Sequence, residues 1–266
     1  MPERLDAVLA ARGLARSRTH AATLIADGLV SVDGRPVVKA ATRVADDADL
    51  AVATSDHYVS RAAHKLIAAL DAFGVDVAGR VALDMGASTG GFTQVLRERG
   101  ADRVIAVDVG HGQLAASIAA DPGVVSLEGF NVRHMTAASL AEASGIAAAP
   151  TLVTGDLSFI SLAHVLPAVK ATVAETADIV LLIKPQFEVG RTAVKGGLVT
   201  DPALRADAVA GVLWSAWDNG LGVLGVVSSP LPGTHGNREY LAWLAPGRGS
   251  NPTEWLSTVN RLAGEA

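Results

Sequence analysis

The stretch ADIVLLIKP, residues 177–185, decides the fold of this chain. It is an apolar run of the length expected for a buried strand, and it ends at Lys184 and a proline. In open α/β sheets, ligands bind at the carboxyl ends of the strands. A lysine at that end is either an ordinary surface residue at a strand-to-loop junction or part of a binding site.

Three further apolar runs end at an acidic residue. VALD ends at Asp84, VIAVD ends at Asp108, and TLVTGD reaches Asp156. Helical patterns, with apolar residues three and four positions apart, separate such runs, as in residues 90–100 and 161–175. Alternating strands and helices predict an α/β fold with a mainly parallel sheet that helices cover on both faces. We expect the four charged residues to gather along one edge of that sheet.

Composition favours a globular protein with a large core. The chain has 266 residues, of which 50% are hydrophobic and 18% are charged, so one large domain plus a small one is the natural division. The absence of cysteine excludes disulfides. We expect a cytoplasmic protein, because no signal peptide opens the sequence and no apolar segment approaches the roughly 20 residues that cross a bilayer.

The N-terminal segment is basic, although the whole chain has a net charge of −5. It predicts two short helices, with Ser17 as the N-cap of the second, then a hairpin turn at residues 33–34 and a further strand over residues 44–52. The basic residues form either a solvated surface or a surface that contacts RNA phosphates. The candidates for RNA binding are Arg4, Arg16, Arg18, Lys39, Arg43 and, beyond this segment, Arg61.

Residues 4–37 resemble the small RNA-binding domain first described in ribosomal protein S-four. The matching features are the leading RLD, the serine-arginine pair at residues 17–18 and the GLVSVDG hairpin at residues 28–34. The resemblance implies a small α+β RNA-binding domain over residues 1–53. A linker over residues 54–59 and a larger domain over residues 60–266 then follow.

The glycine-rich turn DMGASTGGF, residues 84–92, joins the first core strand to its helix. Its spacing departs from the dinucleotide fingerprint G-x-G-x-x-G, because Ser88 stands where the second glycine belongs. The turn resembles the first motif of S-adenosylmethionine-dependent methyltransferases, which implies that cofactor. The implied cofactor-binding residues in this turn are Asp84, Gly86, Ser88, Thr89, Gly90, Gly91 and Phe92.

Further acidic and amide residues follow the neighbouring strands. Asp108 can accept hydrogen bonds from ribose hydroxyls in either cofactor class, so it indicates a nucleoside ligand without naming it. Glu128 and Asn131 follow the third strand, where they either read an adenine or belong to an ordinary polar loop. We include both, together with Asp156, among the cofactor-binding candidates.

Lys65 lies near the start of a predicted helix that leads into the sheet. With Asp156, Lys184 and Glu239 it forms the lysine, aspartate, lysine, glutamate set of the FtsJ-like 2′-O-ribose methyltransferases. The segments SRAAHKL, AVDVGHGQL, GDLSFISL, IVLLIKPQFEVG and PGTHGNREY resemble the TlyA family of rRNA methyltransferases, also called haemolysin A. The resemblance covers nearly the whole chain. It implies a Rossmann-like sheet and 2′-O-methylation of cytidine in large-subunit rRNA, with the small subunit as a further target.

The residue types fit this chemistry. A ribose hydroxyl is a poor nucleophile at neutral pH, so the enzyme must assist its deprotonation and align it with the methyl group. Our hypothesis is that Lys184 is the base or orients the hydroxyl. Lys65 would then favour the neutral amine of Lys184 or hold the target phosphate, while Asp156 and Glu239 position the ammonium groups.

Three other functions stay open at this point. A haemolysin or membrane-active protein is suggested only by the second family name. A non-catalytic ribosome-assembly factor would keep the fold and bind RNA, and a nicotinamide-dependent oxidoreductase would share the sheet. We expect no metal site, because the histidines are not spaced as ligands. The glycine-rich loop at residues 186–201, with Arg191 and Lys195, is either a mobile lid over RNA or a surface loop without function.

Overall fold

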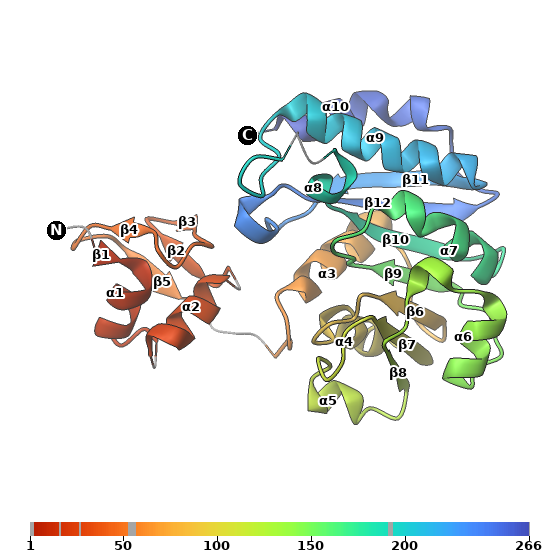
Figure 1. Cartoon of the computed structure of the whole chain (residues 1–266), viewed down its shortest axis with the longest axis horizontal. Coiled ribbons are helices and arrows are strands. Elements are labelled where there is room, and N and C mark those ends of the chain that lie inside the picture. The colour runs from red at the N-terminus through yellow and green to blue at the C-terminus, as the bar shows by residue number, and fades with distance from the viewer. Residues whose placement is uncertain (1–2, 16, 27, 53–56, 191–193, 266) are drawn as a thin grey trace.

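The computed structural model describes residues 3–15, 17–26, 28–52, 57–190 and 194–265, and Figure 1 shows the whole chain. A small N-terminal unit precedes a larger unit that is built on one seven-stranded sheet. The elements of the N-terminal unit are β1 (Glu3–Arg4), α1 (Leu5–Ala11), α2 (Arg18–Ala26), β2 (Val30–Val32), β3 (Arg35–Pro36), β4 (Arg43–Val44) and β5 (Leu50–Val52).

The N-terminal unit has its own hydrophobic core. The two helices and the small sheets bury Leu5, Leu9 and Ile25 completely. The predicted hairpin is confirmed: Asp33 and Gly34 have φ angles of 51° and 74°, the left-handed values that a two-residue type I′ turn requires. All buried members of this core lie between residues 5 and 50, so it is separate from the cores of the larger unit.

The single strand predicted over residues 44–52 is wrong in detail. Two short strands replace it: β4 pairs with β1, whereas β5 pairs with β2. Between them the chain turns, and the amide of Ala48 donates to the carbonyl of Ala45. The acidic run at residues 46–47 is exposed in this turn, which explains why the apolar residues on either side do not form one strand.

The large sheet has the order β11-β12-β10-β9-β6-β7-β8, and the strands from β10 to β8 are parallel, as predicted. Its elements are α3 (Ala62–Phe73), β6 (Val81–Met85), α4 (Gly91–Glu98), β7 (Arg103–Asp108), α5 (Ala116–Ala119), β8 (Val124–Glu128), α6 (Ala137–Ser144), β9 (Leu152–Gly155), α7 (Leu166–Thr172), β10 (Asp178–Ile183), α8 (Pro185–Glu188), α9 (Pro202–Asp218), β11 (Leu221–Ser228), β12 (Tyr240–Pro246) and α10 (Leu256–Gly264).

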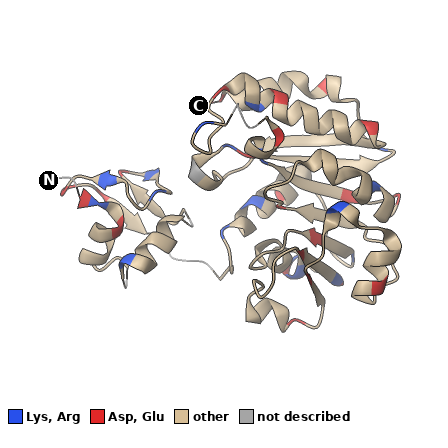
Figure 2. Ribbon diagram, in the orientation of Figure 1, with Lys and Arg blue, Asp and Glu red and all other residues tan. Residues whose placement is uncertain are grey.

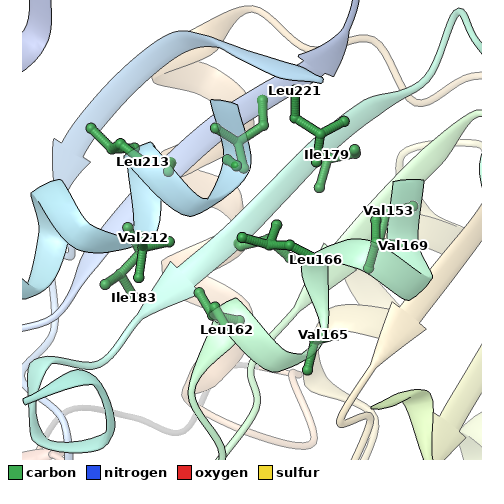
Figure 3. Packing of buried hydrophobic residues seen from close by; sticks show 14 of the residues in the cluster. Val153, Leu162, Val165, Leu166, Val169, Ile179, Ile183, Val212, Leu213 and Leu221 are labelled. Atoms are coloured by element: carbon green, nitrogen blue, oxygen red, sulfur yellow. The ribbon is translucent and has the colours of Figure 1, made fainter. Parts of the chain in front are cut away.

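Both faces of the sheet are buried, which is why β10 reads as an unbroken apolar run. Ile179 and Ile183 point to one face, where they pack with α7 and α9 as Figure 3 shows. Val180 and Leu182 point to the opposite face, which α3 and α4 cover. Alternate side chains of one strand therefore belong to two different hydrophobic cores.

The helix predicted over residues 161–175 is divided. A 3-10 turn, Leu162–His164, precedes α7, and Pro167 occupies the first turn of that helix. Proline has no amide hydrogen to donate, so it is accommodated where helical amides have no partner.

The strand β12 brings a distant segment to the functional edge of the sheet. It runs antiparallel to β10, and Tyr240 at its start lies opposite Ile183 at the end of β10. The beginning of β12 is therefore at the same edge as the carboxyl ends of the parallel strands. Glu239 and Lys184 directly flank these two paired positions.

Candidate active site

Lys184 follows β10 and is held by two oxygen atoms. Its Nζ lies 2.6 Å from Oδ1 of Asp156, which follows β9, and it donates to Oγ of Ser158 at 2.8 Å. The strands β9 and β10 are neighbours in the sheet, so the parallel pairing itself places the lysine beside the aspartate. Both side chains keep some exposure, 11% for Lys184 and 18% for Asp156.

The second lysine forms a buried pair. Lys65, on α3, donates from Nζ to Oε2 of Glu239 at 2.6 Å, and the two side chains are only 6% and 2% exposed. Lys65 is enclosed in this structure, so the expectation that it holds the target phosphate has no support in its position. It instead fixes Glu239, which directly precedes β12.

A cavity of about 300 Å³ connects the two pairs, since Lys184 and Glu239 both line it. Two aromatic residues on its wall lie close together: the rings of Phe159 and Phe187 have centroids 5.2 Å apart. Lys184 Nζ lies 6.0 Å from the centroid of Phe187. The other lining residues are Ser158, Gln186, Val194, Gly197, Thr234 and Asn237.

Phe159 is unusual in two respects. It is 91% exposed, and its φ angle of 65° lies in the left-handed region that a bulky side chain rarely adopts. Strained backbone of this kind is found at functional sites. Our sequence reasoning missed Phe159 and Phe187, although both lie in the family segments GDLSFISL and IVLLIKPQFEVG and closely follow a strand.

A larger cavity, of about 570 Å³, adjoins the glycine-rich turn. Gly86 and Ser88 line it, and Asp156 and Ser158 connect it with the lysine. The turn approaches the neighbouring strand closely: a Cβ atom at Gly86 would lie 2.9 Å from the carbonyl oxygen of Asp156. Only glycine fits there, because its φ of 79° is also left-handed.

Most residues of the glycine-rich turn also line a smaller cavity of about 160 Å³, and Lys184, which follows β10, lines it too. Phe92 is nearly buried and also belongs to a core under α4. Gly91 lies against the start of α3, since a Cβ there would be 3.2 Å from the backbone nitrogen of Ala63 and 2.9 Å from the Cβ of Ser60 just before that helix. The predicted cofactor residues that line this smaller cavity are Gly86, Ser88, Thr89, Gly91, Phe92 and Asp156.

Gly90 does not line the cavities, and it has a structural function. It is the N-cap of α4, with a left-handed φ of 98°, and a Cβ atom there would lie 2.9 Å from a methyl carbon of Leu114. The conformation and the lack of space both require glycine.

Asp84 differs from its predicted role. Its side chain is fully buried, and its oxygens accept hydrogen bonds from Thr93 Oγ1 at 2.7 Å and Thr154 Oγ1 at 3.1 Å. Burial raises its pKa to about 6. It does not line the described cavities, and its two hydroxyl partners belong to α4 and β9, so it joins that helix to the sheet.

The acids and amide after the next strands are placed differently from one another. Asp108 lines the large cavity, and its two oxygens accept hydrogen bonds from the backbone amides of Ser88 and Gly110. Asn131 also lines this cavity. Glu128 is exposed, accepts from the amide of Gly112 at 2.7 Å and is not among the residues that line the cavity.

Part of the predicted RNA-binding set gathers around one buried carboxylate. Arg4 and Arg18 lie 2.9 Å and 3.3 Å from Oδ2 of Asp6. The hydrogen bond from Arg4 lowers the pKa of Asp6 to about 2. Arg43 is the strand partner of Arg4, and these charges are distributed over the unit as Figure 2 shows. Two cations side by side favour an anionic partner.

The other candidates of this set lie apart or outside the described residues. Lys39 is exposed on the turn that precedes β4. Arg61 is half-buried and lies close to Gly28: a Cβ atom added to that glycine would be 2.9 Å from Nη1 of Arg61. Arg16, residues 54–56 of the predicted linker and Arg191 in the predicted lid lie outside the described residues.

The described residues include neither a membrane-spanning helix nor a cluster of metal ligands. In that part of the chain, no helix is both long and apolar enough to cross a membrane. No group of three or more histidine, aspartate or glutamate side chains within the same ranges is arranged to hold a metal ion.

Two protein-family models match the chain. The model of the S4 domain matches residues 3–50, and that of the FtsJ-like methyltransferases matches residues 58–245. The second match covers most of the chain and contains all four residues of the lysine and carboxylate pairs.

Similar proteins share both parts. The chain is 54% identical over 244 residues to the 16S/23S rRNA (cytidine-2′-O)-methyltransferase TlyA of Mycobacterium tuberculosis, covering 91% of this chain and 89% of that protein. It is 37% identical to hemolysin A of Brachyspira hyodysenteriae, over 90% and 98% of the two chains. A solved Streptococcus thermophilus structure, provisionally called a hemolysin, superimposes with a TM-score of 0.76 at 34% identity, over 99% and 96% of the chains. The chain belongs to the FtsJ-like methyltransferase family and carries an S4 domain at its N-terminus.

Proposed function

We propose that this protein transfers a methyl group from S-adenosylmethionine to the ribose 2′-oxygen of a cytidine in ribosomal RNA. One observation carries the proposal: Lys184 and Ser158 lie at the boundary between the cavities beside the glycine-rich turn and the aromatic cavity. A donor on one side and an acceptor on the other would meet at this lysine. The names of the relatives, which specify rRNA and the cytidine 2′-oxygen, support the choice of substrate.

The cavity beside the glycine-rich turn suits S-adenosylmethionine. Its volume of about 570 Å³ lies in the range of cofactor sites. Asp108 would hold the ribose of the cofactor and Asn131 the base, while the backbone at Gly86 and Ser88 would admit the methionine portion. When bound, this cofactor supplies an electrophilic methyl group on sulfur. Asp156 lines both cavities on this side, so its carboxylate lies where a positively charged ligand is favoured.

Lys184 would act on the acceptor side as an orienting cation. It is held by Asp156 and Ser158, which fix the direction of the ammonium group. An ammonium that donates to the ribose 2′-oxygen orients the hydroxyl and stabilises the negative charge that develops on the oxygen as its proton passes to solvent. This role requires no neutral lysine, and we favour it over direct base catalysis.

Phe159 would hold the target nucleotide. Stacking of a base on an exposed aromatic ring contributes about 1–3 kcal/mol and needs no particular base. A nucleotide turned out of its helix could bring its 2′-oxygen to Lys184 in the cavity, and the exposed ring beside Phe187 would offer its base a new stacking surface.

The two units would divide the work. Residues 1–53 would bind folded rRNA through Arg4, Arg18, Lys39 and Arg43, and residues 60–266 would carry out the transfer, with residues 54–59 as the linker. Arg61, near the junction, would contact RNA beside the first unit. An enzyme that modifies ribosomal subunits would act in the cytoplasm.

Methylation of defined rRNA tests this proposal. Ribosomal subunits from a strain that lacks this gene are incubated with the purified protein and S-adenosylmethionine, and ribose methylation is mapped along the rRNA. We expect a new 2′-O-methyl group on cytidine that requires the cofactor. Methylation of a base, or none on either subunit, would contradict the proposal.

The name hemolysin calls for a second measurement. Relatives with that name match 90% and 99% of this chain. Leakage of liposomes by the purified protein, unchanged by Lys184→Ala, would favour a membrane-active function. A purely RNA-binding assembly factor needs no catalytic lysine, so it would keep its function in ribosome assembly when Lys184 is replaced. Loss of that function in Lys184→Ala would exclude this alternative.

A further inference from the structure

Two amide side chains, Gln186 and Asn237, line the cavity that also contains Phe159 and Phe187. They differ in whether their polar atoms have hydrogen-bond partners. Asn237 is buried, accepts from the amide of Val199 at 3.1 Å and donates to the carbonyls of Gly197 and Thr234 at 2.6 Å and 2.9 Å. All of these bonds join loops on one side of the cavity. Both amide hydrogens of Asn237 are used and its oxygen already accepts one bond, so this side chain shapes the wall of the cavity.

Gln186 has the opposite property. It follows Lys184 by two residues on α8 and lines the same cavity, and its Oε1 is buried without a hydrogen-bond partner among the described residues. A buried acceptor that lacks a donor costs about 1–3 kcal/mol relative to a satisfied one. Such a group calls for a functional explanation, and a ligand that brings an N–H into the cavity would satisfy it.

The surroundings of Gln186 indicate which part of the substrate brings this N–H. Lys184 lies on the cavity wall and is placed to meet the ribose oxygen, and the rings of Phe159 and Phe187 offer a surface for a base. A base stacked there extends its hydrogen-bonding edge away from its ribose. The amide two residues beyond the lysine is suited to contact that edge.

We propose that Gln186 selects the target base by accepting a hydrogen bond from its exocyclic amino group, so that the site takes cytosine and rejects uracil. Cytosine carries an amino donor where uracil carries a carbonyl acceptor. In the bound state that we propose, Oε1 of Gln186 meets the edge of the base, and uracil would place two acceptors against each other. A buried polar group left unpaired penalises the wrong ligand more strongly than a good contact rewards the right one. This inference rests on the proposed methyl transfer.

The test compares two bases at the methylated position. The cytidine that the wild-type protein modifies is mapped first, and subunits are then prepared in which that position is uridine. For wild-type protein, we expect methyl transfer to cytidine to exceed that to uridine by about tenfold to a hundredfold in kcat/KM. In Gln186→Leu, which keeps the approximate size but has no acceptor, we expect the two values to approach each other, mainly by loss of activity on cytidine.

Matched measurements separate base recognition from a structural effect. Gln113→Leu removes the same type of side chain from the cavity of about 570 Å³ beside the glycine-rich turn. This variant should weaken cofactor binding and preserve the preference for cytidine. Calorimetric titration of Gln186→Leu with S-adenosylmethionine should give the wild-type affinity. A wild-type protein that methylates uridine as well as cytidine, or a Gln186→Leu variant that keeps the full preference, would overturn this inference and leave the proposed methyl transfer intact. Absence of methylation by wild-type protein on both substrates would instead refute the methyl transfer itself.

Discussion

The two lysine–carboxylate pairs have the same N–O distance, 2.6 Å, but very different surroundings. Lys65 and Glu239 are 6% and 2% exposed, whereas Lys184 and Asp156 are 11% and 18% exposed and line the cavities. A buried ion pair loses hydration and contributes to the fold only while both partners remain. The partly exposed pair can exchange a contact for a substrate. The two pairs have equal N–O distances, but their different exposure indicates two functions. The buried pair builds the site, and the partly exposed pair acts in it.

The largest effect should come from Lys184, the lysine of the partly exposed pair. Lys184→Ala removes the group that would orient the ribose hydroxyl, so we expect methyl transfer to fall by about 10⁴-fold. The free energy of unfolding and the affinity for S-adenosylmethionine should change little, because the side chain is partly solvated. Single-turnover methylation, denaturant unfolding and calorimetry measure the three quantities. A variant that loses stability rather than activity would erase the distinction between the pairs.

The buried pair should respond in the opposite way. Lys65→Ala leaves the charge of Glu239 buried without its partner, so we expect the free energy of unfolding to fall by about 4 kcal/mol. Replacing both residues, as Lys65→Met with Glu239→Leu, should recover most of the stability but not the methyl transfer. Urea unfolding of the single and double variants measures the difference. Equal stability of all three proteins would show that the buried pair does not support the fold.

Asp84 extends the comparison to a buried carboxylate that has hydroxyl partners but forms no ion pair with the described residues. Its folded-state pKa of about 6 is above the ordinary 3.8, so protonation favours the folded state. Its contribution is fully present below about pH 4 and is lost as the pH rises through 6, by about 3 kcal/mol. Asp84→Asn should lack this loss, which urea unfolding from pH 4 to pH 7 would show. Parallel curves for the two proteins would contradict the assignment.

The smallest effect concerns the packing that holds Glu239. A Cβ atom at Gly233 would collide with Oε1 of Glu239, although the φ of −76° at this glycine is accessible to any residue. We expect Gly233→Ala to displace the carboxylate and to lower methyl transfer about tenfold. Gly211→Ala is the matched control, since nothing lies within 4 Å of the added atom. Equal activity of the two variants would show that the position of Glu239 is not critical.

Much of the fold could be predicted from the apolar runs. The parallel strands β6, β7, β9 and β10 were located correctly because buried strands are unbroken apolar segments, and their carboxyl ends fix where charged residues gather. The placement of Asp156 beside Lys184 follows directly, since adjacent parallel strands end side by side. Local pattern alone also located the hairpin at residues 33–34, because its turn requires two left-handed residues.

Other features depended on contacts between distant segments. Asp84 and Asp108 each close an apolar run of the sequence, yet Asp84 lies within β6 and is buried against two threonines, whereas Asp108 is the last residue of β7 and lines a cavity. Sequence position does not distinguish them, because the direction of a side chain at a strand end depends on how the following turn folds back. The exposed ring of Phe159 and the unpartnered oxygen of Gln186 are likewise visible only in the folded chain.

The sequence by itself determined the class of sheet, the edge that carries the site and, through resemblance, the set of four charged residues. Only the tertiary structure decided how that set divides into pairs. The reason is the direction of β12: because it is antiparallel to β10, its first residue reaches the carboxyl edge and carries Glu239 to Lys65, 174 positions away in the chain. Such a pairing depends on long-range packing, which no local periodicity encodes.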